Sequence, residues 1–183
     1  MKLLLAVVAL ATVLAPVQGR ADERILQFME DRWTHALLRH VGDESDSGPL
    51  ALGLADCVDK RALDRRRRNA ARRLGTIFER SGVHIDLIAT SEWCRAIETA
   101  KLLKLRPVTV EPALNASAPD DNDAAERILE LLDSMRASET ALIVTHAGNI
   151  KALTGRDSSP GEVIVVRLRT GEDLEIIGAF KPD

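Results

Sequence analysis

Two arginines and two histidines follow short apolar runs in this chain of 183 residues. Arg39 and His40 directly follow one such run, His146 follows a second, and Arg95 lies just beyond a third. A guanidinium group presents a planar fork of donors that suits phosphate or carboxylate. A neutral, well-oriented imidazole can act as a nucleophile. If the four side chains meet, they form a cationic, donor-rich pocket for a tetrahedral dianion.

Alternating strands and helices would bring these side chains together. The patterning predicts strands at 35–39, 83–90, 107–110 and 141–145, helices at 21–33, 63–80, 92–105, 124–136 and 149–153, and a late hairpin of strands 163–168 and 174–177. This alternation is typical of an α/β three-layer αβα sandwich with a mainly parallel central sheet. The carboxyl ends of parallel strands open onto one crevice, where ligands bind.

Composition excludes several other classes of function. The net charge of −3 gives no bulk positive field for nucleic acid. The basic face of the helix at 63–80 is read first as a solvated surface, with docking to an anionic partner or lipid headgroup as the alternative. The chain lacks GxxxxGK[ST] and GxGxxG motifs, which argues against a nucleotide cradle. No carboxylate or cysteine cluster with metal-ligand spacing is present, so we expect neither metal nor cofactor.

The N-terminus resembles a secretory signal. Lys2 precedes an apolar run, and small residues suit cleavage after Gly19, with cleavage after Ala21 as a second option. We therefore expect a signal peptide at 1–19 and a single mature domain at 20–183, periplasmic or secreted. A membrane anchor is the alternative, but the run is short for a bilayer span, so we expect no stable span in the mature form.

Cys57 and Cys94 are the only cysteines. In an oxidising compartment an even pair is read first as a disulfide. Two buried thiols are the alternative reading.

Several segments resemble one known family. Leu37–His40 resembles the RH signature of the histidine phosphatase superfamily, which has the phosphoglycerate-mutase-like fold. The segments 56–68, 91–100 and 144–150 are similar to the "DC..QR.L....R", "S..CR..ETA" and "V.H..NI" patterns of a secreted bacterial branch, and Gly161-Glu162 resembles a GE pair there. The resemblance covers nearly the whole mature chain.

The resemblance implies a role for each matching residue. His40 would be the nucleophile that forms a phosphohistidine, and Arg39, Arg95 and His146 would bind the phosphoryl oxygens. Arg61 would reach the same phosphate. Water would then hydrolyse the intermediate without a metal. Both cysteines occur in that branch, which is consistent with a Cys57–Cys94 bridge.

The chain departs from the family pattern in places. Val41, Lys60 and Arg67 stand where the family commonly has glycine or alanine, glutamine, and glycine. The general acid is not identified. The loop after the third strand offers Glu111, Asp120, Asp121 and Asp123, with Asn115 and Ala116 near the expected place, and Glu162 is a further candidate.

The sequence thus predicts an extracytoplasmic phosphomonoesterase acting on a small phosphorylated substrate, by analogy an envelope phosphosugar. A catalytically weak phosphate- or phosphoglycan-binding protein on the same fold is the alternative. A mutase fits less well outside the cytoplasm, where its substrates are scarce.

Overall fold

A six-stranded sheet forms the centre of the molecule. The computed structural model describes residues 24–42, 57, 63–116, 123–169 and 174–182. The strands are β1 (Thr34–Arg39), β2 (Leu87–Thr90), β3 (Val108–Val110), β4 (Ala141–Thr145), β5 (Val163–Leu168) and β6 (Leu174–Phe180). Their order across the sheet is β3-β2-β4-β1-β5-β6. The predicted signal peptide at 1–19 lies outside the described residues.

Strand direction divides the sheet into two parts. β3, β2, β4 and β1 are parallel to one another, whereas β5 runs antiparallel to β1 and β6 antiparallel to β5. The predicted mainly parallel sheet and the late hairpin are therefore confirmed. β4 has the predicted bounds, because its continuous apolar run is buried on both faces.

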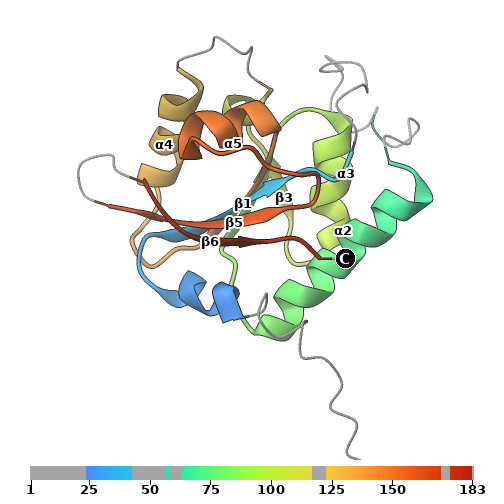
Figure 1. The fold of residues 1–183 in the computed structure, drawn as a ribbon, viewed down its shortest axis with the longest axis horizontal. Helices are drawn as coiled ribbons and strands as arrows, with labels where there is room; N and C mark the ends of the chain where they lie inside the picture. The colour runs from blue at the N-terminus through green and yellow to red at the C-terminus, as the bar shows by residue number, and fades with distance from the viewer. Residues whose placement is uncertain (1–23, 43–56, 58–62, 117–122, 170–173, 183) are drawn as a thin grey trace, which may run out of the picture.

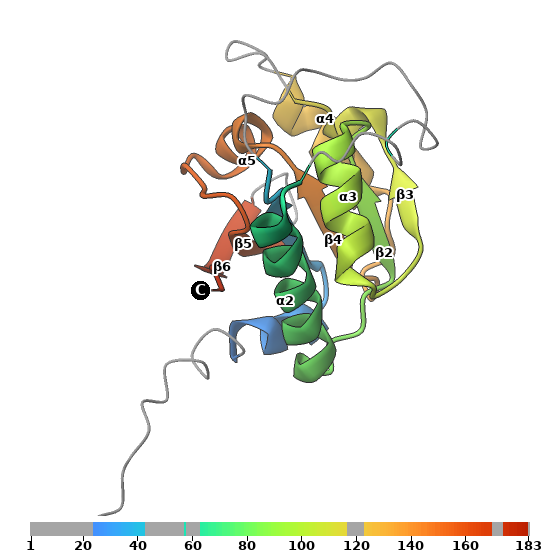
Figure 2. The same ribbon diagram turned by 90° about the vertical axis from the view of Figure 1, so that its right-hand side faces the viewer.

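Helices cover both faces of the sheet (Figures 1 and 2). α2 (Arg65–Ser81) and α3 (Cys94–Leu103) lie on one face, and α4 (Ala124–Asp133) and α5 (Ala147–Thr154) lie on the other. Two short 3₁₀ helices, η1 (Gln27–Glu30) and η2 (Pro112–Leu114), complete the described elements. Successive β1 residues alternate between the two cores: Leu38 packs on the α2/α3 side and Leu37 on the α4/α5 side. This is the predicted three-layer sandwich.

The position of β1 beside β4 creates a switch point. The helix that follows β1 lies on one face of the sheet, and the helix that follows β4 lies on the other. Neighbouring parallel strands whose connections diverge in this way leave a crevice at their carboxyl ends. The residues directly after β1 and β4 are His40 and His146.

The N-terminal helix is shorter than predicted. The pattern predicts a helix over 21–33, but the described helical turns end at Glu30, and Trp33 has a left-handed φ of 59°. Hydrogen bonds explain the early end. The Trp33 N–H donates to the Ala137 carbonyl, and the Trp33 carbonyl accepts from the Leu168 N–H, so this backbone already joins the sheet.

The boundaries of β2 and α4 are among the others that differ from prediction. β2 begins at Leu87 rather than at 83, since the Asp86 carboxylate accepts from the Thr140 N–H at 2.8 Å and ends the loop before the strand. α4 ends at Asp133, three residues earlier than expected. Within the described part of the chain, no helix is long and apolar enough to cross a membrane.

A glycine allows α2 and α3 to pack closely. A Cβ atom added to Gly75 in α2 would lie 2.1 Å from the backbone oxygen of Leu103, the last residue of α3. That oxygen is backbone and cannot move aside as a flexible side chain would. The side chain of Gly75 is therefore limited to hydrogen by this contact.

We expect Gly75→Ala to lower the free energy of unfolding by about 1–3 kcal/mol, the usual cost of overpacking a core. Alanine favours an isolated helix by about 1 kcal/mol over glycine, so a purely local effect would have the opposite sign. Urea denaturation measures the change, with Arg73→Ala on the exposed face of α2 as the matched control. A Gly75→Ala protein more stable than the parent would contradict this packing.

Candidate active site

His40 lies at the carboxyl end of β1 and is fully buried. Its backbone N–H donates to the Thr145 carbonyl at 3.1 Å, which extends the β1–β4 pairing by one residue. Because β1 and β4 are parallel and in register, His146 lies level with His40. The centroids of the two rings are 4.9 Å apart, with an edge-on interplanar angle of 68°.

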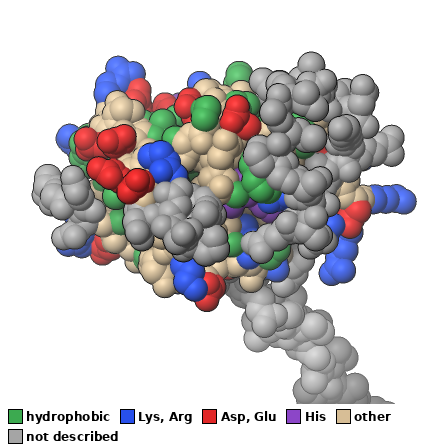
Figure 3. Space-filling view, turned by 90° about the horizontal axis from the view of Figure 1, so that it is seen from above, with side chains coloured by type: hydrophobic (Ala, Val, Ile, Leu, Met, Phe, Trp, Pro, Cys, Tyr) green, Lys and Arg blue, Asp and Glu red, His purple; other side chains and the backbone are tan. Residues whose placement is uncertain are grey.

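His146 is joined to the end of a third strand. Its Nε2 lies 2.8 Å from the Oγ of Ser91, the residue that follows β2. The carboxyl ends of β1, β4 and β2 therefore each contribute a side chain to one buried cluster. Histidine side chains appear in purple near the centre of the face seen in Figure 3, with basic and hydrophobic side chains beside them.

Arg95 fixes the state of the His40 ring. It lies in the first turn of α3, its side chain is buried, and its Nε–H donates to His40 Nε2 at 3.0 Å. An arginine has no acceptor, so Nε2 must carry the lone pair. In the neutral ring the proton therefore resides on Nδ1.

Burial and charge keep both rings neutral. Desolvation lowers the pKa of His40 to about 2, and the charges of His146, Arg95 and Arg39 act in the same direction, while the Gly42 backbone opposes them. Desolvation likewise lowers the pKa of His146 to about 3, again with help from Arg95 and Arg39. A neutral ring has a lone pair available for attack on phosphorus.

Arg39 completes the predicted set of four. Its side chain is half-buried, its Nη1 donates to the carbonyl of Ser158, and its charge acts on both histidines. The structure thus brings together Arg39, His40, Arg95 and His146. Their catalytic roles stay predictions.

Trp93 is part of this cluster, although sequence reasoning missed it. The Arg95 guanidinium carbon lies 4.0 Å from the centroid of the Trp93 ring, a cation–π distance. The ring also meets His146 edge-on, with centroids 4.8 Å apart. Its position two residues before the arginine is the one signal that the sequence offers.

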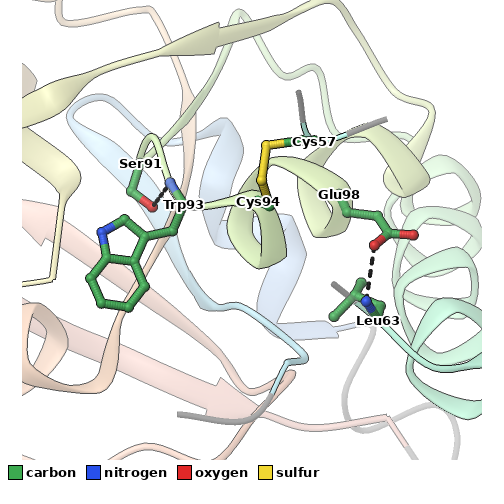
Figure 4. Close-up of a disulfide and its surroundings, with 6 residues drawn as sticks. All are labelled: Cys57, Leu63, Ser91, Trp93, Cys94 and Glu98. Carbon is green, nitrogen blue, oxygen red and sulfur yellow. Dashed lines mark hydrogen bonds between the residues drawn. A yellow bond between two sulfur atoms is a disulfide. The ribbon is translucent and has the colours of Figure 1, made fainter. Parts of the chain in front are cut away.

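The predicted disulfide between Cys57 and Cys94 is confirmed, with a Cα–Cα distance of 5.2 Å. Cys94 is the first residue of α3 and immediately precedes Arg95. Figure 4 shows the bridge at the start of this helix, with the Trp93 ring pointing away from it. The bond therefore attaches Cys57 covalently to the helical turn that carries the site arginine.

A second tie holds the start of α2 against α3. The Glu98 carboxylate accepts from the Leu63 N–H at 3.0 Å and from Arg68 Nε at 2.6 Å (Figure 4 shows the first contact). Arg68 therefore contributes an interhelical ion pair rather than a solvated face alone. Arg61 and Lys60 lie outside the described residues. Val41 is buried, and its N–H donates to Thr99 Oγ1 at 3.3 Å.

The candidate acids lie in different surroundings. Glu111 is half-buried at the end of β3, where its N–H donates to the Thr90 carbonyl at 2.8 Å. Asp123 precedes α4, while Asp120 and Asp121 lie outside the described residues. Glu162 has both carboxylate oxygens engaged by its own loop, by Arg156 and by the Ser159 N–H.

The position where an acid was expected holds an amide instead. Asn115 Nδ2 donates to the Glu92 carboxylate at 2.6 Å, and Asn115 Oδ1 accepts from the Glu92 N–H at 2.9 Å. This reciprocal pair joins the loop after β3 to the turn before α3. Among the residues with a described position, no group of three or more His, Cys, Asp or Glu side chains could hold a metal ion.

Comparisons with known proteins identify the fold. No family model and no curated protein matches the sequence. A mycobacterial glucosyl-3-phosphoglycerate phosphatase matches with a TM-score of 0.59 and 16% identity over 79% of this chain and 96% of its own. The protein histidine phosphatase SixA, solved with tungstate, matches with a TM-score of 0.60 and 17% identity over 81% and 96%.

A third structure extends this agreement. The α-ribazole phosphatase from Shigella flexneri matches with a TM-score of 0.60 and 17% identity over 78% of this chain and 94% of its own. The chain therefore has the fold of the histidine phosphatase superfamily, as the sequence predicted. Assignment to a secreted branch stays a prediction.

Removing the disulfide should destabilise the protein. For the 37-residue separation, the loop-entropy model gives a loss of about 3–4 kcal/mol in the double variant Cys57→Ser/Cys94→Ser. Chemical denaturation of the oxidised parent and the variant measures the difference. Equal stabilities would show that the bridge does not constrain the unfolded chain as the model assumes.

Stability should also fall in acid. Three buried histidines, His35, His40 and His146, have pKa values lowered to about 4, 2 and 3, chiefly by desolvation. Below pH 6.5 the unfolded chain binds protons at these histidines that the folded chain does not. The free energy of unfolding is therefore highest above pH 6.5 and decreases as the pH falls toward 4. Each histidine should contribute about 1 kcal/mol per pH unit.

Urea denaturation between pH 7.5 and 4.5 measures this slope. His35 Nδ1 accepts from the Ala141 N–H at 3.2 Å, a bond that glutamine can replace, so His35→Gln should reduce the slope by about 1 kcal/mol per pH unit. The same substitution at the exposed His84 is the matched control. An unchanged slope in His35→Gln would contradict the assignment of His35 as a buried neutral ring.

Proposed function

We propose that the protein is an extracytoplasmic phosphomonoesterase that works through a phosphohistidine on His40. The observation that carries this proposal is the contact between Arg95 and His40. The Arg95 Nε–H donates to His40 Nε2 at 3.0 Å, inside a buried site where the ring is neutral. This places the lone pair of the nucleophile beside a cation suited to phosphate.

In the first step, Nε2 of His40 attacks phosphorus as the bond from phosphorus to the leaving oxygen breaks. For this step the Arg95 Nε–H must redirect its hydrogen bond from His40 Nε2 to a phosphoryl oxygen, because Nε2 needs its lone pair for the new bond to phosphorus. Arg39, Arg95 and His146 stabilise the charge on the phosphoryl oxygens in the in-line transition state. Arg61 is a further candidate ligand.

In the second step, water attacks phosphorus, the bond to Nε2 breaks, and phosphate leaves with the neutral ring restored. The leaving oxygen of the first step needs a proton, and a positioned acid typically contributes about 10²–10⁴-fold. Glu111 and the acidic loop after it are the candidates for this role. The proposed chemistry uses no metal.

Location outside the cytoplasm is supported by two features. The N-terminal sequence has the composition of a signal peptide, and Cys57 and Cys94 form a disulfide. Disulfides persist mainly in oxidising compartments.

The proposed substrate class follows from the fold and from the proposed location outside the cytoplasm. The proteins of similar fold are a glucosyl-3-phosphoglycerate phosphatase, an α-ribazole phosphatase and a protein histidine phosphatase, so this fold serves different leaving groups. The mycobacterial protein has been solved in complex with VO₃ and with inorganic phosphate, which supports a phosphate-like anion as a ligand of this fold. For an extracytoplasmic enzyme we propose a small phosphorylated molecule, with an envelope phosphosugar as the first candidate.

The mature protein should hydrolyse p-nitrophenyl phosphate and form an acid-labile, base-stable phosphoenzyme. His40→Ala should lower kcat by at least about 10³-fold, since it removes the attacking atom. Exposed His84→Ala is the matched control and should retain the parent rate.

Two results would contradict the proposed phosphomonoesterase activity. The first is a parent protein with no turnover and no phosphoenzyme. The second is binding of phosphate that survives in His40→Ala and is lost in Arg39→Ala without turnover in any variant, which would indicate a phosphate-binding protein.

A further inference from the structure

A single peptide group connects Glu162 with the site arginine. The Ser158 carbonyl accepts from Nη1 of Arg39. The N–H of the same peptide, which belongs to Ser159, donates to Oε2 of Glu162 at 2.7 Å. The carboxylate and the guanidinium therefore lie at opposite ends of one amide.

Two donors of the same loop occupy both oxygens of the Glu162 carboxylate. Its Oε1 accepts from Nη2 of Arg156 at 2.6 Å, and its side chain is only 13% exposed. With a guanidinium on one oxygen and a backbone N–H on the other, both oxygens act as acceptors. These two contacts hold the Glu162 carboxylate in one position within its own loop.

The backbone brings the two residues side by side. The Arg39 N–H donates to the Glu162 carbonyl at 3.1 Å, and the Gly161 N–H donates to the Arg39 carbonyl at 3.0 Å. Gly161 has a φ of 77°, a left-handed conformation that favours glycine and turns the loop back toward β1. The loop 156–162 is thus folded against the strand end that carries Arg39 and His40.

We infer that Glu162 is a positioning residue for Arg39 and acts through the Ser158–Ser159 peptide. The inference rests on the proposed function, in which Arg39 binds the phosphoryl group. It replaces the general-acid role considered for Glu162 from the sequence. Arg156 serves the same purpose indirectly, since it holds Glu162.

The physical basis is polarisation of the shared amide. A hydrogen bond from the Ser159 N–H to a charged carboxylate is stronger than one to a neutral acceptor. It polarises the peptide, so the Ser158 carbonyl becomes a better acceptor for the Arg39 guanidinium. A guanidinium already held in place loses less freedom when a phosphoryl group binds, which favours both binding and reaction.

The test compares two substrates that differ in leaving group. p-Nitrophenyl phosphate needs little help from an acid, whereas 2-glycerophosphate releases a poor leaving group. We expect Glu162→Ala to lower kcat/KM by about tenfold for both substrates alike. Glu162→Gln keeps an oxygen acceptor for the Ser159 N–H but loses the charge, so its loss should be intermediate.

The matched control is Glu175→Ala. Glu175 lies on β6, is also half-buried, and forms an ion pair with Arg169. It should retain the parent kcat/KM. If Glu162→Ala instead affects 2-glycerophosphate by 10²-fold or more and leaves p-nitrophenyl phosphate unchanged, Glu162 is a general acid and the inference is overturned.

A double-variant cycle tests the route through Arg39. With Arg39→Ala already present, adding Glu162→Ala should lower kcat/KM by less than twofold. A tenfold loss in both backgrounds would indicate a general structural effect and would overturn the inference.

The same cycle can be read by calorimetric binding of inorganic phosphate. Glu162→Ala should weaken binding about tenfold in the parent background and less than twofold in Arg39→Ala. A parent that binds phosphate without turnover would contradict the proposed enzyme and leave this coupling measurable. Equal weakening in both backgrounds would contradict the coupling alone.

Discussion

The parallel pairing of β1 with β4 is the constraint on which the site depends. The register sets Arg39 against Thr145, and the His40 N–H bonds to the Thr145 carbonyl at 3.1 Å, so the two histidines must emerge level. The helices that follow these strands lie on opposite faces of the sheet, an arrangement in which ligands commonly bind at the strand ends. A one-residue slip in this register would point the side chain of His40 or His146 toward the opposite face of the sheet.

Beside the two histidines, Arg39 and Arg95 are each held by a neighbouring group that has no proposed role in binding phosphate. Arg95 lies against the Trp93 ring and follows a cysteine that is bridged to Cys57. Arg39 donates to the Ser158 carbonyl, and the N–H of the same peptide donates to the Glu162 carboxylate. The positive charges of Arg39 and Arg95 oppose protonation of both rings and, with burial, lower the pKa values of His40 and His146.

The sequence predicted that Arg39, His40, Arg95 and His146 lie together because strand ends are visible as breaks in apolar runs. β4 has a continuous buried run and was predicted residue for residue, and His146 followed from it. The predicted end of the helix over 21–33 was wrong because Trp33 bonds to Ala137 and Leu168, residues far away in the chain. The role of Glu162 depends on a turn that places its carboxylate beside a peptide N–H, and apolar patterning does not report such contacts.

The chain has no tyrosine and only two tryptophans, which lie at opposite ends of β1. Trp33 precedes the strand, and Trp93 contacts Arg95 and His146 beyond its far end. Six strand residues at about 3.3 Å each separate the two environments by roughly 20 Å. With Trp33 replaced by phenylalanine, ultraviolet emission would come from one indole that touches two side chains of the site. An anion that draws the guanidinium away from this ring would change its emission, so the protein carries its own optical probe of occupancy.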